Sequence, residues 1–367
     1  MKTVVLEVAS MEIRAGIENF LMNIIRNLDH DKIQVDFLSG IPGPYDEEIK
    51  SYGGRIFRGP SISNRIERIK YIKKLLSEHP EIKTVHIHGN TAISCIDARI
   101  FKKLGVSNII IHSHSDGTKG IFSLIKHWIC KYYIRKCANY NFSCSKSAGK
   151  WMFGADKFAV ISNAINLDAF RFDRSTALEY KKRLKLENKV VVGHVGRFET
   201  PKNHQFILKV FKQIHDIHKD SHLLLIGEGT LYNEVLQLIK DYNLQDCTTI
   251  IRNSSEINYL LQVMDVFIFP SLWEGLGISL VEAQASGLPC VVSQVIKEEV
   301  CVTPLITKMD LQTSVNEWAD FVWKQATMIK DRSNNIYIQQ LSEAGFNIKE
   351  TVRELENIYL YYENRNL

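Results

Sequence analysis

The sequence predicts an α/β protein of two domains, each built on a parallel β-sheet. Its 367 residues exceed what a single hydrophobic core usually holds. Short β-branched runs alternate with amphipathic stretches, which is the pattern of parallel sheets covered by helices. The alternation starts at the N-terminus, pauses in a polar stretch of helical character at residues 168–188, and then restarts. Two successive units of similar size therefore predict two Rossmann-like domains.

The elements of the first half follow from this alternation. Apolar β-branched runs predict strands, and apolar residues with a helical period predict the helices between them. We expect strands at residues 2–9, 34–40, 84–90, 108–114 and 140–145, and helices at 17–28, 65–79 and 121–137. Residues 158–165 close this half.

The second half repeats the pattern and ends in a helix. We expect strands at residues 190–198, 222–229, 248–253, 266–271 and 288–293, and helices at 203–216, 231–243, 257–264 and 278–287. The last stretch, residues 351–367, predicts a terminal helix rich in tyrosine.

Composition and cysteine usage narrow the class of protein. No apolar run approaches the roughly 18 residues that cross a bilayer, and Glu7 interrupts the first apolar run, which argues against a signal peptide. Seven scattered cysteines without a CxxC pair indicate the reduced thiols of a cytosolic protein. Cys130, Cys137 and Cys144 are spaced by seven residues, which we interpret as a buried helical stripe and not as a metal site.

Charge is distributed unevenly along the chain. The net charge is +5, yet residues 1–170 contain 24 lysines and arginines against 16 acidic residues, and the remainder contains 22 against 25. Anionic partners are therefore expected at the first half.

The loop after the strand at 190–195 carries the first candidate site. Gly196, Arg197 and Lys202 precede a predicted helix, where free backbone N–H groups and two cations can hold a diphosphate. A solvated loop with two basic residues is the alternative. Gly227 and Gly229 follow the next strand in a similar way. Neither half has a full GxGxxG motif with a following acidic residue, so a nicotinamide site is poorly supported.

The stretch PSLWEGLGISLVEAQASG carries the second candidate site, a pair of glutamates. Gly275 and Gly277 keep Glu274 in the loop after a buried strand, whereas Glu282 lies inside the following helix. Both carboxylates can then contact one ligand, one from the loop and the other from the helix. Charge complementarity at a helix N-terminus would explain one carboxylate, but not a second one on an otherwise apolar helix.

Together these motifs resemble the retaining glycosyltransferases of family 4, which have the GT-B fold. The resemblance rests on Arg197 with Lys202, on the Gly-Glu-Gly turn at 227–229, and on Glu274 and Glu282 with seven residues between them. RAGIENFLMNIIRNL at 14–28 and VISNAINLDAF at 160–170 also fit, so the resemblance covers nearly the whole chain. The chain is most similar to the bacterial capsule and exopolysaccharide enzymes.

The resemblance implies a domain plan and a reaction. Two Rossmann-like domains would face each other across a cleft, with acceptor binding in residues 1–170 and nucleotide-sugar binding in 171–345. Residues 346–367 would form a helix that returns toward the N-terminal domain. Such enzymes take a UDP-sugar as co-substrate and extend an oligosaccharide on a lipid diphosphate, in capsule, exopolysaccharide or O-antigen synthesis. They act in the cytoplasm, peripherally on the inner face of the cell membrane.

The resemblance also implies roles for the donor-side residues. Arg197 and Lys202 would hold the donor diphosphate and stabilise charge on the departing nucleotide. Glu274 would lie near the transferred sugar, and Glu282 would bind the ribose hydroxyls. Gly227 would approach the sugar and the phosphates with its backbone. Four further residues would do the same: Gly275, Leu276, Gly277 and Ile278.

Two N-terminal positions complete the implied site. Gly16 lies in the loop that would close on the phosphates, and His114 resembles the active-site histidine of the family. His112 is two residues earlier on the same strand face, so it remains an alternative to His114. Ala15 and Ala164 stand where the family often has glycine, and a methyl group disfavours positive φ there.

Catalysis is expected to need no metal or other cofactor. The one Asp-x-Asp spelling, Asp29-His30-Asp31, falls between a predicted helix and a strand, where we expect a turn. Arg197, Lys202 and helix N-terminal amides can supply the positive field instead. The family is described by front-face attack of the acceptor hydroxyl, which we adopt as the implied mechanism.

The basic first half suggests an anionic membrane surface as a partner. Residues 55–74 carry seven basic residues against one glutamate, and residues 119–136 mix lysine and arginine with aromatic and aliphatic side chains. An ordinary exposed helix face is the alternative.

Two other functions share some of these features: a sugar-nucleotide epimerase of GT-B shape, and a nucleic-acid-binding protein. The glutamate pair argues against the first, and the lack of a recognised nucleic-acid-binding motif argues against the second.

Overall fold

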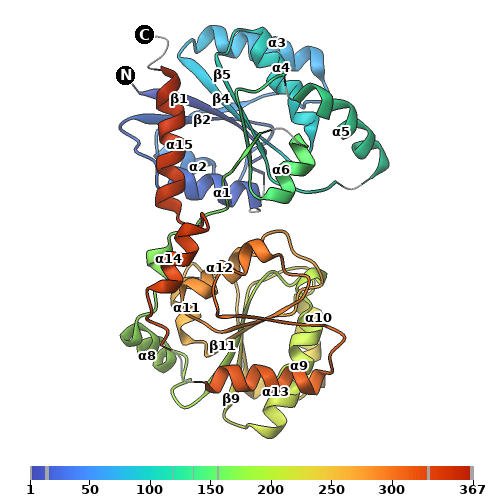
Figure 1. Cartoon of the computed structure of the whole chain (residues 1–367), viewed down its shortest axis with the longest axis vertical. Helices are drawn as coiled ribbons and strands as arrows, with labels where there is room; N and C mark the ends of the chain where they lie inside the picture. The colour runs from blue at the N-terminus through green and yellow to red at the C-terminus, as the bar shows by residue number, and fades with distance from the viewer. Residues whose placement is uncertain are drawn as a thin grey trace. The chain divides into compact units, whose positions relative to one another are not determined.

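The computed structural model describes residues 2–12, 16–118, 120–134, 136–154, 157–328 and 331–363 (Figure 1). The chain divides into two compact units. The N-terminal unit contains Met1–Ala164 and Asn347–Leu367, and the C-terminal unit contains Ile165–Phe346. The boundary thus falls after residue 164, six residues before the position expected from the sequence.

The N-terminal unit is built on a seven-stranded parallel sheet in the order β3-β2-β1-β4-β5-β6-β7. Its strands are β1 (Thr3–Val8), β2 (Ile33–Ser39), β3 (Ile56–Arg58), β4 (Ile82–Gly89), β5 (Asn108–Ser113), β6 (Tyr140–Ser143) and β7 (Ala159–Val160). Its helices are α1 (Gly16–Ile25), α2 (Asp46–Ser51), α3 (Arg65–Glu78), η1 (Ala92–Ser94), α4 (Cys95–Lys103), α5 (Ile121–Ile134), α6 (Lys146–Phe153) and α15 (Ile348–Glu363).

Both faces of this sheet are covered by helices. Side chains alternate between the faces along a strand, so Val5 packs in one core with α1 and α15, while Val4 and Leu6 pack in another with α3 and α4. Helix α15 contacts α1, β1 and β4, and Figure 1 shows it alongside the sheet. The C-terminal segment is therefore part of the N-terminal unit.

The C-terminal unit has a six-stranded parallel sheet in the order β10-β9-β8-β11-β12-β13. Its strands are β8 (Val190–Val195), β9 (Ser221–Ile226), β10 (Thr248–Ile251), β11 (Val266–Phe269), β12 (Cys290–Ser293) and β13 (Ile306–Met309). Its helices are α7 (Leu167–Phe170), α8 (Arg174–Arg183), η2 (Thr200–Lys202), α9 (His204–Ile217), α10 (Tyr232–Asp241), η3 (Gln245–Cys247), α11 (Ile257–Val263), α12 (Ile278–Ala285), η4 (Glu298–Val300), α13 (Val315–Thr327) and α14 (Ile336–Glu343).

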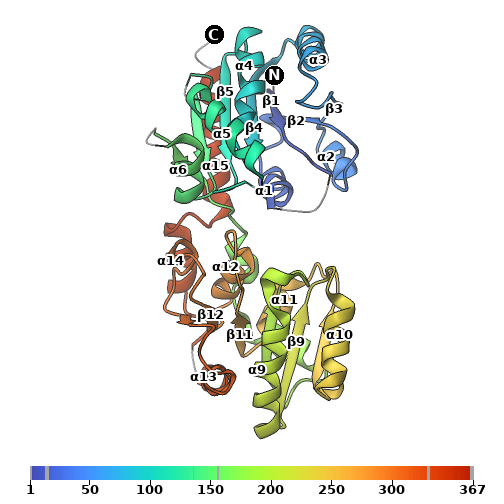
Figure 2. The ribbon, with the colours of Figure 1, turned by 90° about the vertical axis from the view of Figure 1, so that its right-hand side faces the viewer.

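This sheet is also sandwiched between two layers of helices. Helices α9, α10 and α13 share one core with alternate residues of the strands, and α8, α11, α12 and α14 share the other. Figure 2 shows α9 and α10 running alongside β9. The polar stretch at 168–188 contains α7 and α8, which confirms its expected helical character.

One interpretation of the cysteines is wrong. Cys130 lies in α5 and Cys137 in the turn that follows it, but Cys144 comes directly after β6 and donates its backbone N–H to Ser113. The seven-residue spacing therefore crosses from a helix to a strand end and marks no single helical stripe.

Ala164 is not among the described non-glycine residues with positive φ, so this position adopts an ordinary backbone conformation.

None of the described helices combines the length and the apolarity that crossing a bilayer requires.

Asp29, His30 and Asp31 form the expected turn between α1 and β2, closed by a hydrogen bond of 3.1 Å from the Lys32 N–H to the Asp29 carbonyl. The side chain of Asp29 accepts from the Asp31 backbone and pairs with Lys32 at 2.6 Å.

Candidate functional site

The strand order reverses once in each sheet, and the predicted site residues lie at these reversals. In the C-terminal unit the chain runs outward from β8 to β9 and β10, and then returns to β11 on the other side of β8. The connections that leave β8 and β11 therefore diverge, and the carboxyl ends of strands at such a reversal are where α/β sheets usually bind ligands. Arg197 and Lys202 follow β8, and Glu274 follows β11.

Backbone contacts hold the two loops of the C-terminal unit together. The Leu272 N–H donates to the Pro201 carbonyl at 2.8 Å, and the Asn203 side-chain amide donates to the Pro270 carbonyl at 3.1 Å. Asn203 adopts a left-handed conformation, φ 56°, just before α9 begins. These contacts bring loops that are about 70 residues apart in the chain into one structure.

Lys202 and Glu274 form an ion pair at the centre of this structure. The two side chains are only 15% and 17% exposed. The Lys202 ammonium also lies 4.6 Å from the centre of the Phe269 ring, a cation–π contact that the sequence did not indicate. Arg197 is exposed, and its guanidinium makes no hydrogen bond or ion pair with the described residues. The site thus contains one fixed cation and one free cation.

Two glycines shape the backbone around this cluster. Gly277 has φ 75° and directly precedes α12, so the chain turns sharply between Glu274 and the helix. Gly227 lies against the loop after β8, where an added Cβ would stand only 2.1 Å from the Gly196 carbonyl oxygen. The described structure therefore confirms that α12 begins at Ile278 and that Glu274 stays outside it.

Glu282 is the second glutamate of the pair and lies one turn inside α12. Its side chain is half-buried, and its carboxylate makes no hydrogen bond or ion pair with any described residue. Burial raises its pKa to about 8. A carboxylate in this environment has unused acceptor capacity for a ligand with hydroxyl groups.

In the N-terminal unit, the structure separates the two candidate histidines. His112 lies within β5 and is fully buried, whereas His114 follows the strand and is half-buried. The two rings stack with their centres 4.2 Å apart. Gly16 is exposed at the start of α1, and the residues before it, Ile13 to Ala15, lie outside the described part of the chain.

A buried polar network surrounds His114, and the sequence analysis missed it. His88 Nδ1 lies 2.8 Å from His114 Nε2, and His88 Nε2 lies 2.6 Å from Glu7 Oε2. Tyr359 of α15 adds a hydrogen bond to His86 Nδ1 at 2.7 Å and donates to Glu7 Oε1 at 3.2 Å. The available signals were Glu7, which interrupts an apolar strand, and the pattern His-x-His at 86–88, which repeats at 112–114.

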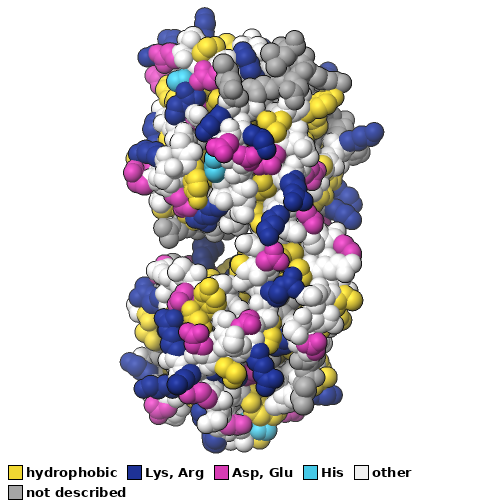
Figure 3. All heavy atoms as spheres, turned by 90° about the vertical axis from the view of Figure 1, so that its left-hand side faces the viewer, with side chains coloured by type: hydrophobic (Ala, Val, Ile, Leu, Met, Phe, Trp, Pro, Cys, Tyr) yellow, Lys and Arg dark blue, Asp and Glu magenta, His cyan; other side chains and the backbone are white. Residues whose placement is uncertain are grey.

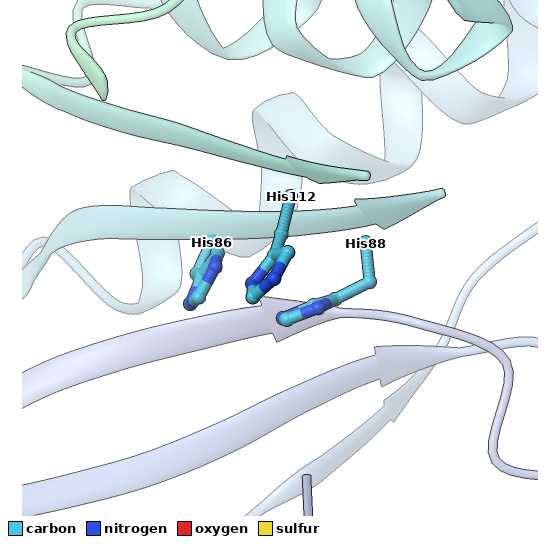
Figure 4. A group of neighbouring side chains, drawn as sticks. All are labelled: His86, His88 and His112. Carbon is cyan, nitrogen blue, oxygen red and sulfur yellow. The ribbon is translucent and has the colours of Figure 1, made fainter. Parts of the chain in front are cut away.

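Three buried histidines lie close together in this sheet, but we do not interpret them as a metal site. His86, His88 and His112 each place a ring nitrogen within 4.8 Å of the others, and Figure 4 shows them on two neighbouring strands. Both nitrogens of His88 already bond to Glu7 and His114, and one nitrogen of His86 bonds to Tyr359. His86 Nε2 and both nitrogens of His112 have no hydrogen-bond partner in the described structure. A metal ion held by all three would still have to displace a hydrogen bond of His88, so we interpret His86 and His88 as members of the hydrogen-bonded network and His112 as a buried neighbour.

A cavity of about 320 Å³ opens at the carboxyl end of the N-terminal sheet. It is bordered by the segments that follow β1, β2, β3 and β4, and most of its polar lining is uncharged: Ser10, Ser39, Ser61, Asn90, Thr91 and Ser94. His88 reaches it as well. Its one basic lining residue among those described, Arg68, is held by Asp97 through two hydrogen bonds of 2.6 and 2.7 Å. The lining also includes the acidic residue Glu12, so the cavity offers hydroxyl and amide groups and a carboxylate, and its described lining has no free cation.

Comparison with solved structures gives the fold class. The chain superposes on a glycosyltransferase from Rickettsia africae with a TM-score of 0.77 at 17% identity, covering 98% of each chain. It superposes on Anabaena HepE, solved in complex with UDP and glucose, with a TM-score of 0.73 at 16% identity, covering 96% of this chain and 98% of that one. Two parallel α/β sheets with these neighbours define the GT-B class of glycosyltransferase folds.

Sequence comparison gives the family. Residues 14–169 match the model of Glycosyltransferase Family 4, and residues 176–345 match that of Glycosyl transferases group 1. The putative glycosyltransferase EpsF of Bacillus subtilis is 32% identical, over 97% of this chain and 96% of that protein. An Escherichia coli α-1,3-galactosyltransferase that acts on GlcNAc-diphosphoundecaprenol is 24% identical, over 98% of this chain and 97% of that protein. The chain therefore belongs to glycosyltransferase family 4, a family of retaining enzymes.

The raised pKa of Glu282 predicts a pH-dependent effect of its replacement. Between the ordinary pKa of 4.5 and about 8, the folded protein keeps a proton that the unfolded chain has released. Stability contributed by this group therefore falls as pH rises through that window. Glu282→Gln removes the titration, so its melting temperature relative to wild type should rise between about pH 5 and about pH 9. A difference that stays constant with pH, as we expect for the surface control Glu256→Gln, would contradict the account.

Proposed function

We propose that this glycosyltransferase moves a sugar from a UDP-sugar to a hydroxyl group of an oligosaccharide carried on a lipid diphosphate, in the synthesis of a capsule, exopolysaccharide or O-antigen. The observation that carries the proposal is the cluster at the strand-order reversal of the C-terminal sheet. There, Lys202 is fixed by Glu274 and Phe269, and Arg197, five residues earlier in the same loop, is exposed without an ion pair among the described residues. Family membership sets aside the epimerase and the nucleic-acid-binding protein.

The donor diphosphate is assigned to Arg197 and Lys202. In a retaining transfer the leaving diphosphate gains negative charge, and preorganised cations lower the barrier because they need no reorientation during the reaction. The Lys202 ammonium is preorganised by its ion pair and its contact with Phe269. Exposed Arg197 can move to the phosphates and bind them in a bidentate manner.

The nucleoside and the sugar are assigned to the two glutamates. Glu282 has unused acceptor capacity and can take hydrogen bonds from both ribose hydroxyls. Such donors favour the ionised carboxylate and would offset its burial. Glu274 accepts from Lys202 and from the Gly275 N–H at 3.2 Å, and it lies in the loop that we expect to contact the transferred sugar. The backbone of Gly275, Leu276, Gly277 and Ile278, together with Gly227, approaches the donor.

The acceptor is assigned to the N-terminal unit. The cavity beside β1 and β4 is lined mostly by uncharged polar groups, together with Glu12, and its arginine is neutralised by Asp97. This chemistry suits the hydroxyls of an acceptor saccharide better than it suits a diphosphate. His114 contacts His88, which lines this cavity, and we assign His114 to the reacting sugars. Gly16 at the start of α1 is assigned to the phosphates.

The relatives support the two substrate classes. Anabaena HepE was solved with UDP-glucose as well as with UDP and glucose, and the Escherichia coli relative uses UDP-galactose and a sugar on diphosphoundecaprenol. A lipid-linked acceptor would place the enzyme at the inner face of the cell membrane.

Helix α5 is the proposed membrane contact. It exposes Phe122 (78%), Trp128 (57%) and Tyr132 (67%) to solvent, with Lys126 among them. On the face drawn in Figure 3, by contrast, basic and acidic side chains are interspersed. The basic stretch at 55–74 contributes less than its charge suggests, because Arg55, Arg58 and Arg68 form ion pairs with aspartates. An exposed aromatic helix with basic residues favours an anionic bilayer surface.

Transfer activity is tested by a UDP-release screen across nucleotide sugars, with a lipid-diphosphate-linked saccharide as acceptor. We expect one UDP-sugar to give release that depends on the acceptor. Glu274→Ala should lower turnover by about 100-fold, because it frees Lys202 and removes an acceptor near the sugar. Glu256→Ala is the matched control, since its carboxylate pairs with Arg183 on the surface of the same unit. Near-normal turnover in Glu274→Ala would refute the assigned role.

Metal independence is tested in the same assay with EDTA. The positive field at the diphosphate is assigned to protein groups, so turnover should be unchanged by chelation. Complete loss of activity that Mn²⁺ restores would contradict this assignment.

Membrane binding is tested by flotation with vesicles that contain or lack anionic lipid. The double variant Phe122→Ser/Trp128→Ser should lose flotation with anionic vesicles, because two exposed aromatic groups leave α5. Leu178→Ser/Ile217→Ser is the matched control, since these side chains are 61% and 68% exposed in the C-terminal unit. Equal flotation of both variants would overturn the assignment to α5.

A further inference from the structure

We infer that Glu7 and His88 are positioning residues that hold His114 in one tautomer, with its Nδ1 lone pair left for a sugar hydroxyl. The inference deepens the proposed function, because it rests on the assignment of His114 to the reacting sugars. Three side chains form a single hydrogen-bonded row: Glu7 on β1, His88 on β4 and His114 directly after β5.

Sheet register brings these residues together. Strand β1 pairs with β4 so that Glu7 stands opposite His86, and β4 pairs with β5 so that His88 stands opposite His112. Residues two apart on a strand share a face, so Glu7, His86, His88 and His112 all point to the side covered by α1 and α15. His114 follows β5 and anchors its backbone N–H on the Gly89 carbonyl at 3.1 Å.

The row begins at a buried anion. Glu7 is 3% exposed, and although burial alone would raise its pKa, the hydrogen bonds with His86 and His88 hold the pKa well below its usual range. Glu7 is therefore ionised at neutral pH and can only accept hydrogen bonds. The contact of 2.6 Å to His88 must then use a proton on His88 Nε2.

The proton on His88 determines the tautomer of His114. Burial first, and then the charge of His86, lowers the pKa of His88 to about 4, so its ring is neutral and carries one N–H. With that proton on Nε2, His88 Nδ1 is an acceptor, and the contact of 2.8 Å must use a proton on His114 Nε2. Burial and the charges of His88 and His86 also lower the pKa of His114 well below its ordinary value. A neutral His114 with its proton on Nε2 keeps a free lone pair on Nδ1.

The other side of the network directs its protons to Glu7 in the same way. The Tyr359 hydroxyl donates to Glu7 Oε1, so the contact of 2.7 Å between this hydroxyl and His86 uses a proton on His86 Nδ1. Tyr359 thereby fixes the second carboxylate oxygen from α15, nearly the whole chain length away from Glu7. The rings of Phe20 and His112 lie 5.1 and 4.2 Å from the His114 ring and limit its rotation.

The arrangement resembles the carboxylate–histidine half of a hydrolase triad, extended by one imidazole. Its consequence is orientation: a sugar hydroxyl that meets His114 donates its proton in the hydrogen bond and keeps its oxygen lone pairs free. If His114 gains partial positive charge as the reaction proceeds, Glu7 stabilises that charge through His88. Neither residue needs to touch a substrate for this effect.

The tautomer is measured by ¹⁵N NMR of histidine-labelled full-length protein, with the His114 signals identified by their loss in His114→Ala. In wild type we expect His114 to be neutral and protonated on Nε2. Glu7→Gln keeps the shape but can donate as well as accept, so the signals should shift toward the other tautomer. Turnover should fall about 10- to 100-fold, as for other supporting partners of functional histidines, with little change in KM. Asp36→Asn is the matched control, because it removes another fully buried carboxylate, paired with Arg55 on the adjacent strand.

The possible outcomes separate this inference from the proposed function. A wild-type His114 with its proton on Nδ1 overturns the inference, even where Glu7→Gln folds too poorly to be examined. Equal spectra of wild type and Glu7→Gln, or equal shifts in Asp36→Asn, overturn it as well. The spectra need no substrate, so full transfer activity in His114→Ala would refute the proposed role of His114 without changing the tautomer result.

Discussion

The reversal of strand order in each parallel sheet is the constraint on which the rest of the structure depends. Parallel strands align their carboxyl ends at one edge, and a chain that builds outward and then returns must leave a crevice where the direction changes. In this protein the reversals lie between β1 and β4 and between β8 and β11. The same topology places Arg197, Lys202 and Glu274 after the central strands of one sheet, and a cavity with mostly uncharged polar lining at the carboxyl end of the other.

The difference between the two crevices is a difference in how charge is compensated. In the C-terminal unit, Lys202 pairs with Glu274, whereas Arg197 of the same loop is exposed and has no ion pair among the described residues. In the N-terminal unit, Arg68 is taken up by buried Asp97, and the negative charge of Glu7 is enclosed by histidines and a tyrosine. A cation without a partner, such as Arg197, suits an anionic donor, whereas a cavity whose arginine is paired suits an uncharged saccharide better than a diphosphate. This contrast is the basis on which we propose donor binding in one unit and acceptor binding in the other.

Much of the fold could be predicted from the sequence, and the misses have physical causes. Long apolar runs such as β8, β9 and β11 gave clear signals, and the glycines at 275 and 277 correctly placed the start of α12. Helix α4 was missed because two of its five buried residues, Cys95 and Ala98, are small and a third, Asp97, is charged. Helix α13 was also missed, although its Ser314–Glu317 capping box could have been found. The roles of Arg197, Lys202, Glu274 and Glu282 came from motif resemblance. The network of Glu7, His88 and Tyr359 depends on register and on a distant helix, which spacing cannot reveal.

The central claim is that Arg197 and Lys202 hold the diphosphate of the donor, and calorimetric binding of UDP and of uridine tests it most directly. The two ligands differ only in the diphosphate, so a residue that binds the diphosphate should affect one ligand and spare the other. The account predicts that Lys202→Ala and Arg197→Ala each weaken UDP binding by about 10-fold or more and leave uridine binding unchanged. Equal losses for both ligands, or no loss for UDP, would contradict it.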